Sequence, residues 1–188
     1  MTSLEPLTTL QNLIPAFFSL HRYCSRRRGD AFAYHLLGLV NESLEKPESA
    51  SELIEKSTSL LETDYEDTEN PMIERQFALA NLNLARLRLS QQDLIGAIDS
   101  FQNVIGLLTA DNDTLTVKLR IQAHIGYGLA NFMNMEIDSA LESLQTALVY
   151  AEDNPILRSH AVVLLSQVMW AIGNEEFKEM AKSQLLQW

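Results

Sequence analysis

Three stretches of this chain repeat one pattern of small and large residues with identical internal spacing. A pattern that recurs over about thirty positions is typical of proteins built from stacked copies of one supersecondary unit. The matched positions are Tyr34, Leu37, Gly38, Ala50, Ile54 and Ser57 in the first copy, Asn81, Leu84, Ala85, Ala97, Phe101 and Val104 in the second, and His124, Tyr127, Gly128, Ala140, Leu144 and Ala147 in the third. The repeat therefore favours a solenoid in which each unit mainly contacts the next.

Each copy has the pattern of two helices that pack closely. In the first copy, Gly38 follows a large apolar residue, and its small size lets a second helix approach. The second helix supplies its own small residue, Ala50, and four positions later Ile54 lies on the same helix face and fills the space beside the contact. Polar turns between the paired helices are expected at Lys46-Pro47, Gln92-Asp93 and Glu136-Ile137-Asp138.

The composition agrees with long helices and a buried core. The 188 residues include only seven Gly and five Pro, so few residues interrupt a helix. A hydrophobic content of 46% is enough to form a real core. Because each hairpin leaves an apolar edge uncovered, neighbouring hairpins must stack, and we expect an all-α protein.

The arrangement resembles the tetratricopeptide (TPR) repeat family. The residues at the family's signature spacing are Tyr34, Leu37, Gly38, Ala50 and Ile54, then Leu84, Ala85, Ala97 and Phe101, then Gly128, Ala140 and Ala147. The resemblance implies a right-handed superhelical solenoid of stacked antiparallel helix pairs. The repeats are longer than the family's standard of about 34 residues, since Ala50 to Ala97 spans 47 residues and Ala97 to Ala140 spans 43. We expect the extra residues in lengthened second helices followed by acidic loops.

The repeat predicts five segments. They are a helical lead-in at 1–28 that belongs to a preceding repeat, TPR-like repeats at 29–74, 75–118 and 119–154, and a divergent terminal helix pair at 155–188. The second helix of the last pair departs from the repeat spacing. A capping unit and a truncated longer array both explain this departure, and the end at Leu-Leu-Gln-Trp188, without a polar tail, favours a fragment.

Charge and cysteine content limit the functional classes. A net charge of −11 with only 14 Lys and Arg argues against a nucleic-acid surface, which needs a basic stripe. The single cysteine, Cys24, fits a reducing compartment, either cytoplasm or nucleus. The N-terminus lacks the features of a secretory signal, and no apolar stretch approaches the length of a bilayer-spanning helix, so we expect no membrane interaction.

No residue cluster indicates catalysis. Cys24 and His21 lie three residues apart on one predicted helix, without an oriented base or an oxyanion site. The four histidines are far apart and have no partners at metal-ligand spacing, and His124 stands where the repeat usually has a large apolar residue, so we expect it in the core. Gly126 and Gly128 lie inside a helical pattern, which indicates packing rather than phosphate binding. We expect no enzymatic activity, no cofactor and no metal.

The TPR resemblance implies that ligands bind a concave surface formed by the first helices. The partner-binding positions predicted there are Leu39, Leu82, Arg86, Leu89, Ile125, Leu129, Phe132 and Trp170, beside His35, Val163 and Gln167. Such an apolar surface suits an extended or helical segment of a partner, with Phe132 and Trp170 as anchors. The alternative is that these two side chains pack against neighbouring helices. The family's carboxylate clamp for chaperone tails is disfavoured, because only Asn83 and Arg86 come near its requirements.

A narrower resemblance covers about residues 30–188. The segments RQFALANLNLARLRLSQQDLIGAIDSFQNVIGLL, GLANFMNMEIDSALESLQTAL and HAVVLLSQVMWAIG look like part of the large TPR subunits of cytoplasmic superkiller complexes. The resemblance implies a scaffold that joins a helicase and a WD-repeat propeller in a complex that assists 3′–5′ messenger RNA decay by the exosome. A self-contained TPR adaptor for a peptide or helical segment is the alternative, although EEFKEMAKSQLLQW is only partly the amphipathic cap that an adaptor needs.

Overall fold

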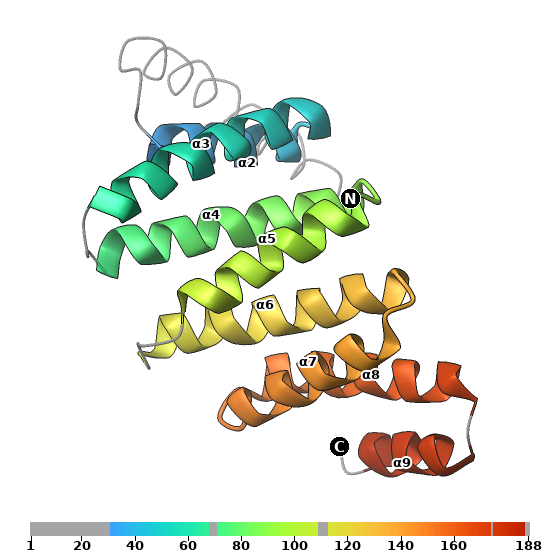
Figure 1. Ribbon diagram of the computed structural model, residues 1–188. Helices are drawn as coiled ribbons and strands as arrows, with labels where there is room; N and C mark the ends of the chain where they lie inside the picture. The colour runs from blue at the N-terminus through green and yellow to red at the C-terminus, as the bar shows by residue number, and fades with distance from the viewer. Residues whose placement is uncertain (1–30, 68–70, 109–112, 174, 187–188) are drawn as a thin grey trace, which may run out of the picture. The chain divides into compact units, whose positions relative to one another are not determined.

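The computed structural model describes residues 31–67, 71–108, 113–173 and 175–186, and these residues form helices without any strand. The helices are α2 (Ala31–Ser43), α3 (Pro47–Asp67), α4 (Pro71–Ser90), α5 (Leu94–Leu107), α6 (Thr114–Met133), α7 (Ile137–Tyr150), α8 (Pro155–Ile172) and α9 (Glu175–Leu186), as Figure 1 shows. The expected all-α class is confirmed. The predicted lead-in at 1–28, with His21 and Cys24, lies outside the described residues.

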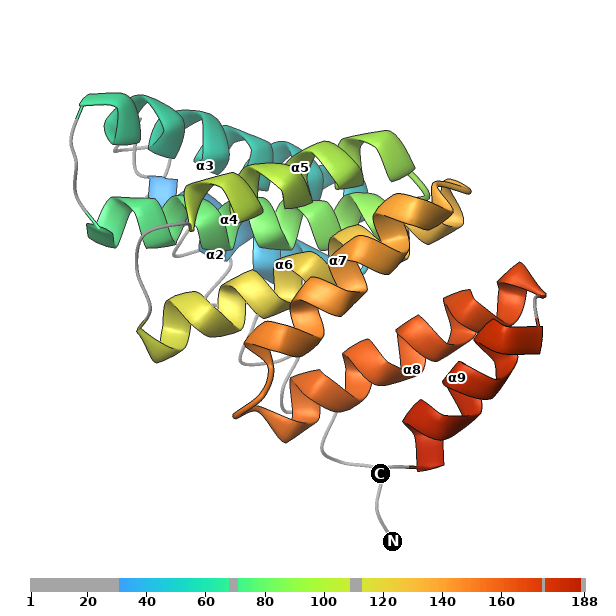
Figure 2. The same cartoon turned by 60° about the horizontal axis from the view of Figure 1, so that its bottom comes forward.

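The chain divides into two compact units within α4, one ending at Ala80 and the other beginning at Asn81. In the first unit α2 packs against α3. In the second unit, each helix from α5 to α8 contacts the next helix along the chain, and α6 also contacts α8 (Figure 2). The second unit thus places two first helices of successive pairs, α6 and α8, side by side.

The small residues of the repeat lie where the paired helices approach most closely. A β-carbon added to Gly38 would lie 2.5 Å from Ile54 Cγ1 and 3.2 Å from the Ala50 carbonyl oxygen. A β-carbon added to Gly128 would lie 2.7 Å from Leu144 Cγ and 3.3 Å from the carbonyl oxygen of the equivalent alanine, Ala140. The predicted reason for the pattern is therefore confirmed in the first and third pairs.

The turns inside the first three pairs share one backbone conformation. Each has a non-glycine residue in the left-handed region, at Glu45 (φ 57°), Gln92 (φ 64°) and Met135 (φ 65°). The amide of the following residue donates a hydrogen bond to the carbonyl oxygen five residues before it, over 3.0 Å at Lys46, 2.9 Å at Asp93 and 2.8 Å at Glu136. These bonds satisfy carbonyls left free at each helix end. The last pair uses Gly173 (φ 76°), the residue type that adopts this conformation most readily.

The extra repeat length is distributed differently from the expectation. Helix α3 is lengthened, to 21 residues, but the next second helix, α5, has only 14. The first helices α4 and α6 have 20 residues each, so the expectation of a lengthened second helix is confirmed for α3 and wrong for α5. The reason is that both first helices begin early, α4 at Pro71 and α6 after Asp113, whose carboxylate accepts hydrogen bonds from the amides of Leu115 and Thr116.

Helix α8 is apolar on more than one face. By length and composition alone it could cross a membrane, with a mean hydropathy of 1.3, so the expectation that no apolar stretch approaches that length is wrong. Its inner face packs Leu165, Val168 and Met169 against Ala140 and Leu144 of α7. A helix that packs into a protein core can have the same length and mean hydropathy as a membrane-spanning helix. Its outer face is also rich in apolar side chains.

Gly128→Ala is expected to destabilise the protein by about 1–2 kcal/mol, because the added methyl group overpacks the contact with Leu144. This loss exceeds the gain of up to about 1 kcal/mol in helix propensity. Gly106→Ala is the matched control, since a β-carbon there meets nothing within 4 Å, and we expect it to be neutral or stabilising. Urea unfolding followed by circular dichroism measures both, and equal effects would contradict the close-approach role of Gly128.

Candidate partner-binding groove

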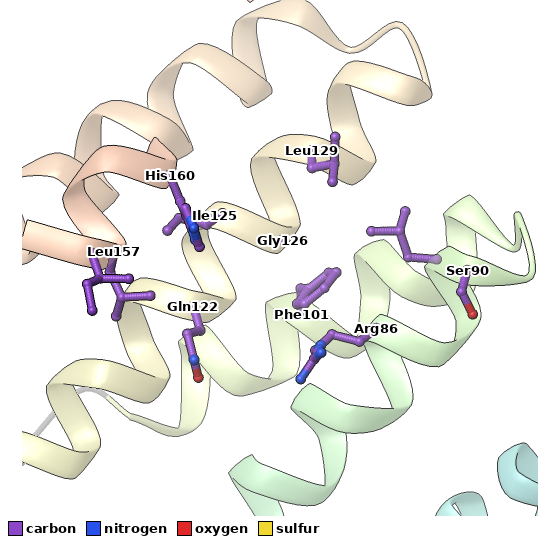
Figure 3. Close-up of a pocket in the computed structure, with 11 residues that line it drawn as sticks. Arg86, Ser90, Phe101, Gln122, Ile125, Gly126, Leu129, Leu157 and His160 are labelled. Atoms are coloured by element: carbon purple, nitrogen blue, oxygen red, sulfur yellow. The ribbon is translucent and has the colours of Figure 1, made fainter. Parts of the chain in front are cut away.

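An apolar groove of about 610 Å³ lies within the second unit, between the end of α4 and helices α5, α6 and α8 (Figure 3). Its volume is in the range of small-ligand and peptide sites. Its lining residues are Arg86, Leu89, Ser90, Phe101, Gln122, Ile125, Gly126, Leu129, Ile156, Leu157 and His160. The groove therefore draws its walls from three successive helix pairs.

Phe101 of α5 and Gly126 of α6 are in close contact at the base of the groove. Phe101 is only 1% exposed. A β-carbon on Gly126 would collide with the Cε1 and Cζ atoms of the Phe101 ring, so only glycine leaves the ring in its present place. The prediction that Gly126 allows close packing, rather than phosphate binding, is confirmed by its contact with the Phe101 ring.

The polar groups of the groove lie at its rim. Arg86, Gln122 and His160 are exposed, and no acidic residue is among the lining residues. Arg88, two positions after Arg86, instead donates hydrogen bonds to the Gly96 carbonyl oxygen (3.2 Å) and to Ser100 Oγ (2.9 Å), which attaches α4 to α5. The two arginines thus differ, because Arg88 attaches α4 to α5 while Arg86 is exposed and lines the groove.

The structure brings four of the predicted partner-binding residues together in the groove, namely Arg86, Leu89, Ile125 and Leu129. The other four lie elsewhere. Leu82 is buried, Phe132 packs against the α7–α8 core, Trp170 is exposed on α8 outside the groove lining, and Leu39 belongs to the first unit. Of the positions named beside them, His35 is buried, whereas Val163 and Gln167 are exposed on α8. The binding roles of all these residues remain predictions.

Sequence reasoning missed the contribution of the first half of α8. Ile156, Leu157 and His160 line the groove, together with Gln122 of α6 and Phe101 of α5. Ile156 and His160 could have been found, because they continue the helical register of Val163 toward the start of the helix. Phe101 could not, because a second helix was not expected to reach this surface.

His124 lies in a smaller cavity of about 240 Å³, lined mainly by polar side chains. Its Nδ1 is 3.1 Å from Ser143 Oγ, and the hydroxyl of Ser143 donates to the His124 carbonyl oxygen, so Nδ1 acts as the donor in the first contact. Burial and the nearby Arg120 lower the pKa of His124 to about 4. The ring is half-buried beside polar side chains and is not part of the buried core, so the expectation that His124 lies in the core is met only in part.

The serine of the second cavity is already engaged in hydrogen bonds. The Ser143 side chain is buried and its proton is engaged by a backbone carbonyl, so it is not arranged as an activated nucleophile. Among the described residues, no group of three His, Cys, Asp or Glu side chains could hold a metal ion. The apolar groove is therefore the better candidate for function.

Two curated proteins of the same name are similar in sequence to nearly the whole chain. No family model matches the chain. Superkiller protein 3 of Schizosaccharomyces pombe is 28% identical over 185 residues, which is 96% of this chain and 13% of the relative. Superkiller protein 3 of Saccharomyces cerevisiae is 26% identical over 182 residues, which is 97% of this chain and 12% of the relative. The chain thus spans about an eighth of the length of these relatives.

Solved structures of repeat proteins share the fold. MamA superposes with a TM-score of 0.73 at 18% identity, covering 100% of this chain and 95% of MamA. A kinesin light chain of Podospora anserina, described as having nearly identical TPR-like repeats, gives a TM-score of 0.71 at 16% identity, covering 95% of this chain and 86% of that one. At these identities the similarity shows the fold alone, and it confirms the TPR solenoid class.

Proposed function

We propose that this chain, which is similar over nearly its whole length to a segment of superkiller protein 3, is a non-enzymatic scaffold for protein–protein interaction. The single observation that carries the proposal is the apolar groove with its polar rim. A preformed groove that exposes Leu89, Ile125 and Leu129 between helices offers anchor sites for the side chains of a partner segment.

The groove supports a protein ligand rather than a small metabolite. It is open along helices of successive pairs, and its few polar groups are spread over the rim instead of converging on one point. Small-molecule sites usually combine enclosure with converging polar groups. A chain segment with several apolar side chains fits the observed lining better.

The finer proposal places the chain in a superkiller complex. In that role it would help to join a helicase and a WD-repeat propeller subunit and would assist 3′–5′ messenger RNA decay by the exosome in the cytoplasm. The similarity to two superkiller proteins over at least 96% of the chain supports this role. The acidic net charge of −11 favours protein partners over direct binding of RNA. A self-contained adaptor that binds a peptide or helical segment in the same groove is the second candidate.

An affinity pull-down with Ile156→Glu tests the scaffold role. The chain is immobilised and incubated with cytosolic extract of its own organism, and captured proteins are identified by mass spectrometry. We expect recovery of the helicase and propeller subunits, and about a ten-fold loss of recovery with Ile156→Glu, because a buried carboxylate at an apolar interface is unfavourable.

Ile95→Glu is the matched control, since Ile95 is an isoleucine of similar exposure on α5 that does not line the groove. Circular dichroism should show that both variants keep their helices. Recovery of the two subunits that is insensitive to Ile156→Glu would place their binding outside the groove. Recovery of a single unrelated protein through Ile156 would support the adaptor, and recovery of nothing would contradict both roles.

A further inference from the structure

The smaller cavity of the second unit, of about 240 Å³, is lined by residues of α5, α6 and α7. On α6 its lining residues are His124 and Tyr127, whereas Ile125 and Leu129 line the apolar groove. Successive residues of an α-helix are about 100° apart, so the two sets are centred about 150° from each other around α6. The cavity is therefore a separate site, on the side of α6 that faces away from the groove.

Five residues of the cavity lining carry a polar side-chain group without a hydrogen bond or ion pair in the part of the chain that the structure describes. These groups are the Gln102 amide, the Tyr127 hydroxyl, the Ser139 hydroxyl, the Glu142 carboxylate and the Nε2 atom of His124. They come from three helices that pack in succession. A cavity that gathers several polar groups from separate elements has the composition of a site for a polar ligand.

The Nε2 atom of His124 is a hydrogen-bond acceptor at neutral pH. Burial and the nearby Arg120 lower the pKa of His124 to about 4, so its ring is uncharged at pH 7. Because Nδ1 carries the proton that is donated to Ser143 Oγ, Nε2 keeps its lone pair. Nε2 is not fully buried, so it is open to a hydrogen-bond donor.

The charge of the cavity lining favours a positively charged donor. Glu142 is exposed, and among the described residues that line the cavity it alone is charged at pH 7, since His124 is neutral. Arg120 does not line the cavity, because its Nε donates a hydrogen bond to the Leu108 carbonyl oxygen over 2.7 Å and its guanidinium lies over the Tyr150 ring. The charge of Arg120 opposes a cation near His124, so the binding of a cation depends on the Glu142 carboxylate.

The size and shape of the cavity fit a single arginine side chain. Its volume equals that of about eight water molecules at about 30 Å³ each. Tyr127 and Ile105 add an aromatic ring and an apolar side chain to the lining. A guanidinium is planar, stacks on aromatic rings and donates to several acceptors at once, whereas an ammonium group is compact and more strongly hydrated. The methylene groups of an arginine can also pack against Ile105.

We propose that this cavity binds the guanidinium of an arginine side chain from a partner protein. Glu142 is its carboxylate partner, Nε2 of His124 is a further acceptor, and the Tyr127 ring is the surface on which it stacks. The inference rests on the proposed binding role, and it adds a second contact on the side of α6 away from the groove. It specifies an arginine in the part of the partner that reaches α5, α6 and α7.

The probe for the test is N-acetyl-L-arginine methylamide, and the readout is the nitrogen NMR signal of His124 Nε2. The variant His124→Gln identifies this signal among those of the four histidines. At pH 7 we expect a saturable shift, with a dissociation constant in the millimolar range that is at least five-fold lower than that of the uncharged citrulline analogue. The lysine analogue should bind at least two-fold more weakly than the arginine analogue. The signal of His160, which lines the apolar groove, should not move.

Glu142→Gln and Asp138→Asn form the matched pair of variants. Both carboxylates are exposed on α7, but only Glu142 lines the cavity. We expect Glu142→Gln to reduce the preference for arginine over citrulline to less than two-fold, because the charge that selects the cation is gone. Asp138→Asn should keep a preference of at least five-fold, and circular dichroism should show that both variants keep their helices.

Several results would overturn the inference. They are the absence of a saturable shift, equal binding of the citrulline or the lysine analogue, equal effects of the two substitutions, and a matching shift of the His160 signal. The pull-down measures the scaffold role independently of this titration. If the arginine analogue does not bind while partners are still recovered through Ile156, the scaffold role stands and the arginine site does not.

Discussion

Phe101→Ala is expected to lower the free energy of unfolding by about 3–5 kcal/mol, the largest stability effect that we predict for a single substitution. Phe101 is 1% exposed and is one of the largest fully buried side chains among the described residues. Its ring packs against Gly126, which has no side chain that could move into the vacated space. The cavity left by the ring would therefore stay largely unfilled, and the cost of the cavity adds to the lost burial of apolar surface.

Chemical denaturation followed by circular dichroism measures this loss. Phe32→Ala is the control, because Phe32 is more than half exposed on α2 and its truncation should cost less than about 1 kcal/mol. Since the chain has two compact units, the unfolding curves need to be fitted for each transition that they show. A loss below about 1 kcal/mol for Phe101→Ala would mean that the surrounding helices move into the vacated space. That result would contradict a rigidly packed contact between α5 and α6 at Phe101.

The Phe101 substitution also connects stability with the candidate groove. Removal of the ring takes away part of the groove base between α5 and α6. Partner binding should therefore fall together with stability, whereas Ile156→Glu should reduce binding alone. This difference separates residues that build the groove from residues that contact a ligand.

The helix pairs could be predicted from the sequence because their signals are local. Gly38, Ala50 and Ile54 lie within 17 positions of one another, and the contact that they make depends on two neighbouring helices only. The positions of the turns were visible for the same reason. Their conformation was not, because Glu45 and Met135 adopt the left-handed region without the glycine that usually marks it.

The groove could be predicted only in part, because it is assembled from separate helix pairs. The residues Arg86, Leu89, Ile125 and Leu129 follow from the register of the first helices, but burial of Leu82 and Phe132 depends on how neighbouring helices pack over them. Likewise, the acidic stretch before Asp67 looks like a loop in sequence, yet it extends α3, since Glu and Asp on an exposed helix face cost little.

Acidification from pH 6.5 to pH 4 is expected to destabilise the protein through His124 by about 2 kcal/mol. Burial and the Arg120 guanidinium lower the pKa of His124 from 6.5 to about 4 in the folded chain. The unfolded chain therefore takes up the proton first, so this stabilisation is fully present above pH 6.5 and is lost as the pH falls toward 4. A shift of this size corresponds to about 3 kcal/mol, and partial exposure of the ring reduces it.

The surroundings of His124 explain why its charged form is unfavourable. Its ring stacks on Tyr150, with centroids 5.8 Å apart, and the Arg120 guanidinium lies 5.0 Å from the centroid of the same Tyr150 ring. A second positive charge would thus appear beside one that is already buried. Burial also lowers the pKa of His35 in the first unit. Both histidines therefore contribute to the loss of folding stability as the pH falls.

Comparison of His124→Gln with the unsubstituted chain isolates this contribution. Glutamine cannot take up the proton, but its amide can still donate a hydrogen bond to Ser143 Oγ. Urea unfolding at several pH values between 7 and 4 should therefore give a shallower loss of stability for the variant, while protonation of the exposed carboxylates affects both proteins equally. Parallel curves would show that His124 has the same pKa in the folded and unfolded chain. His35→Gln should flatten the profile in the same direction, because its burial acts on the same charged form of the imidazole.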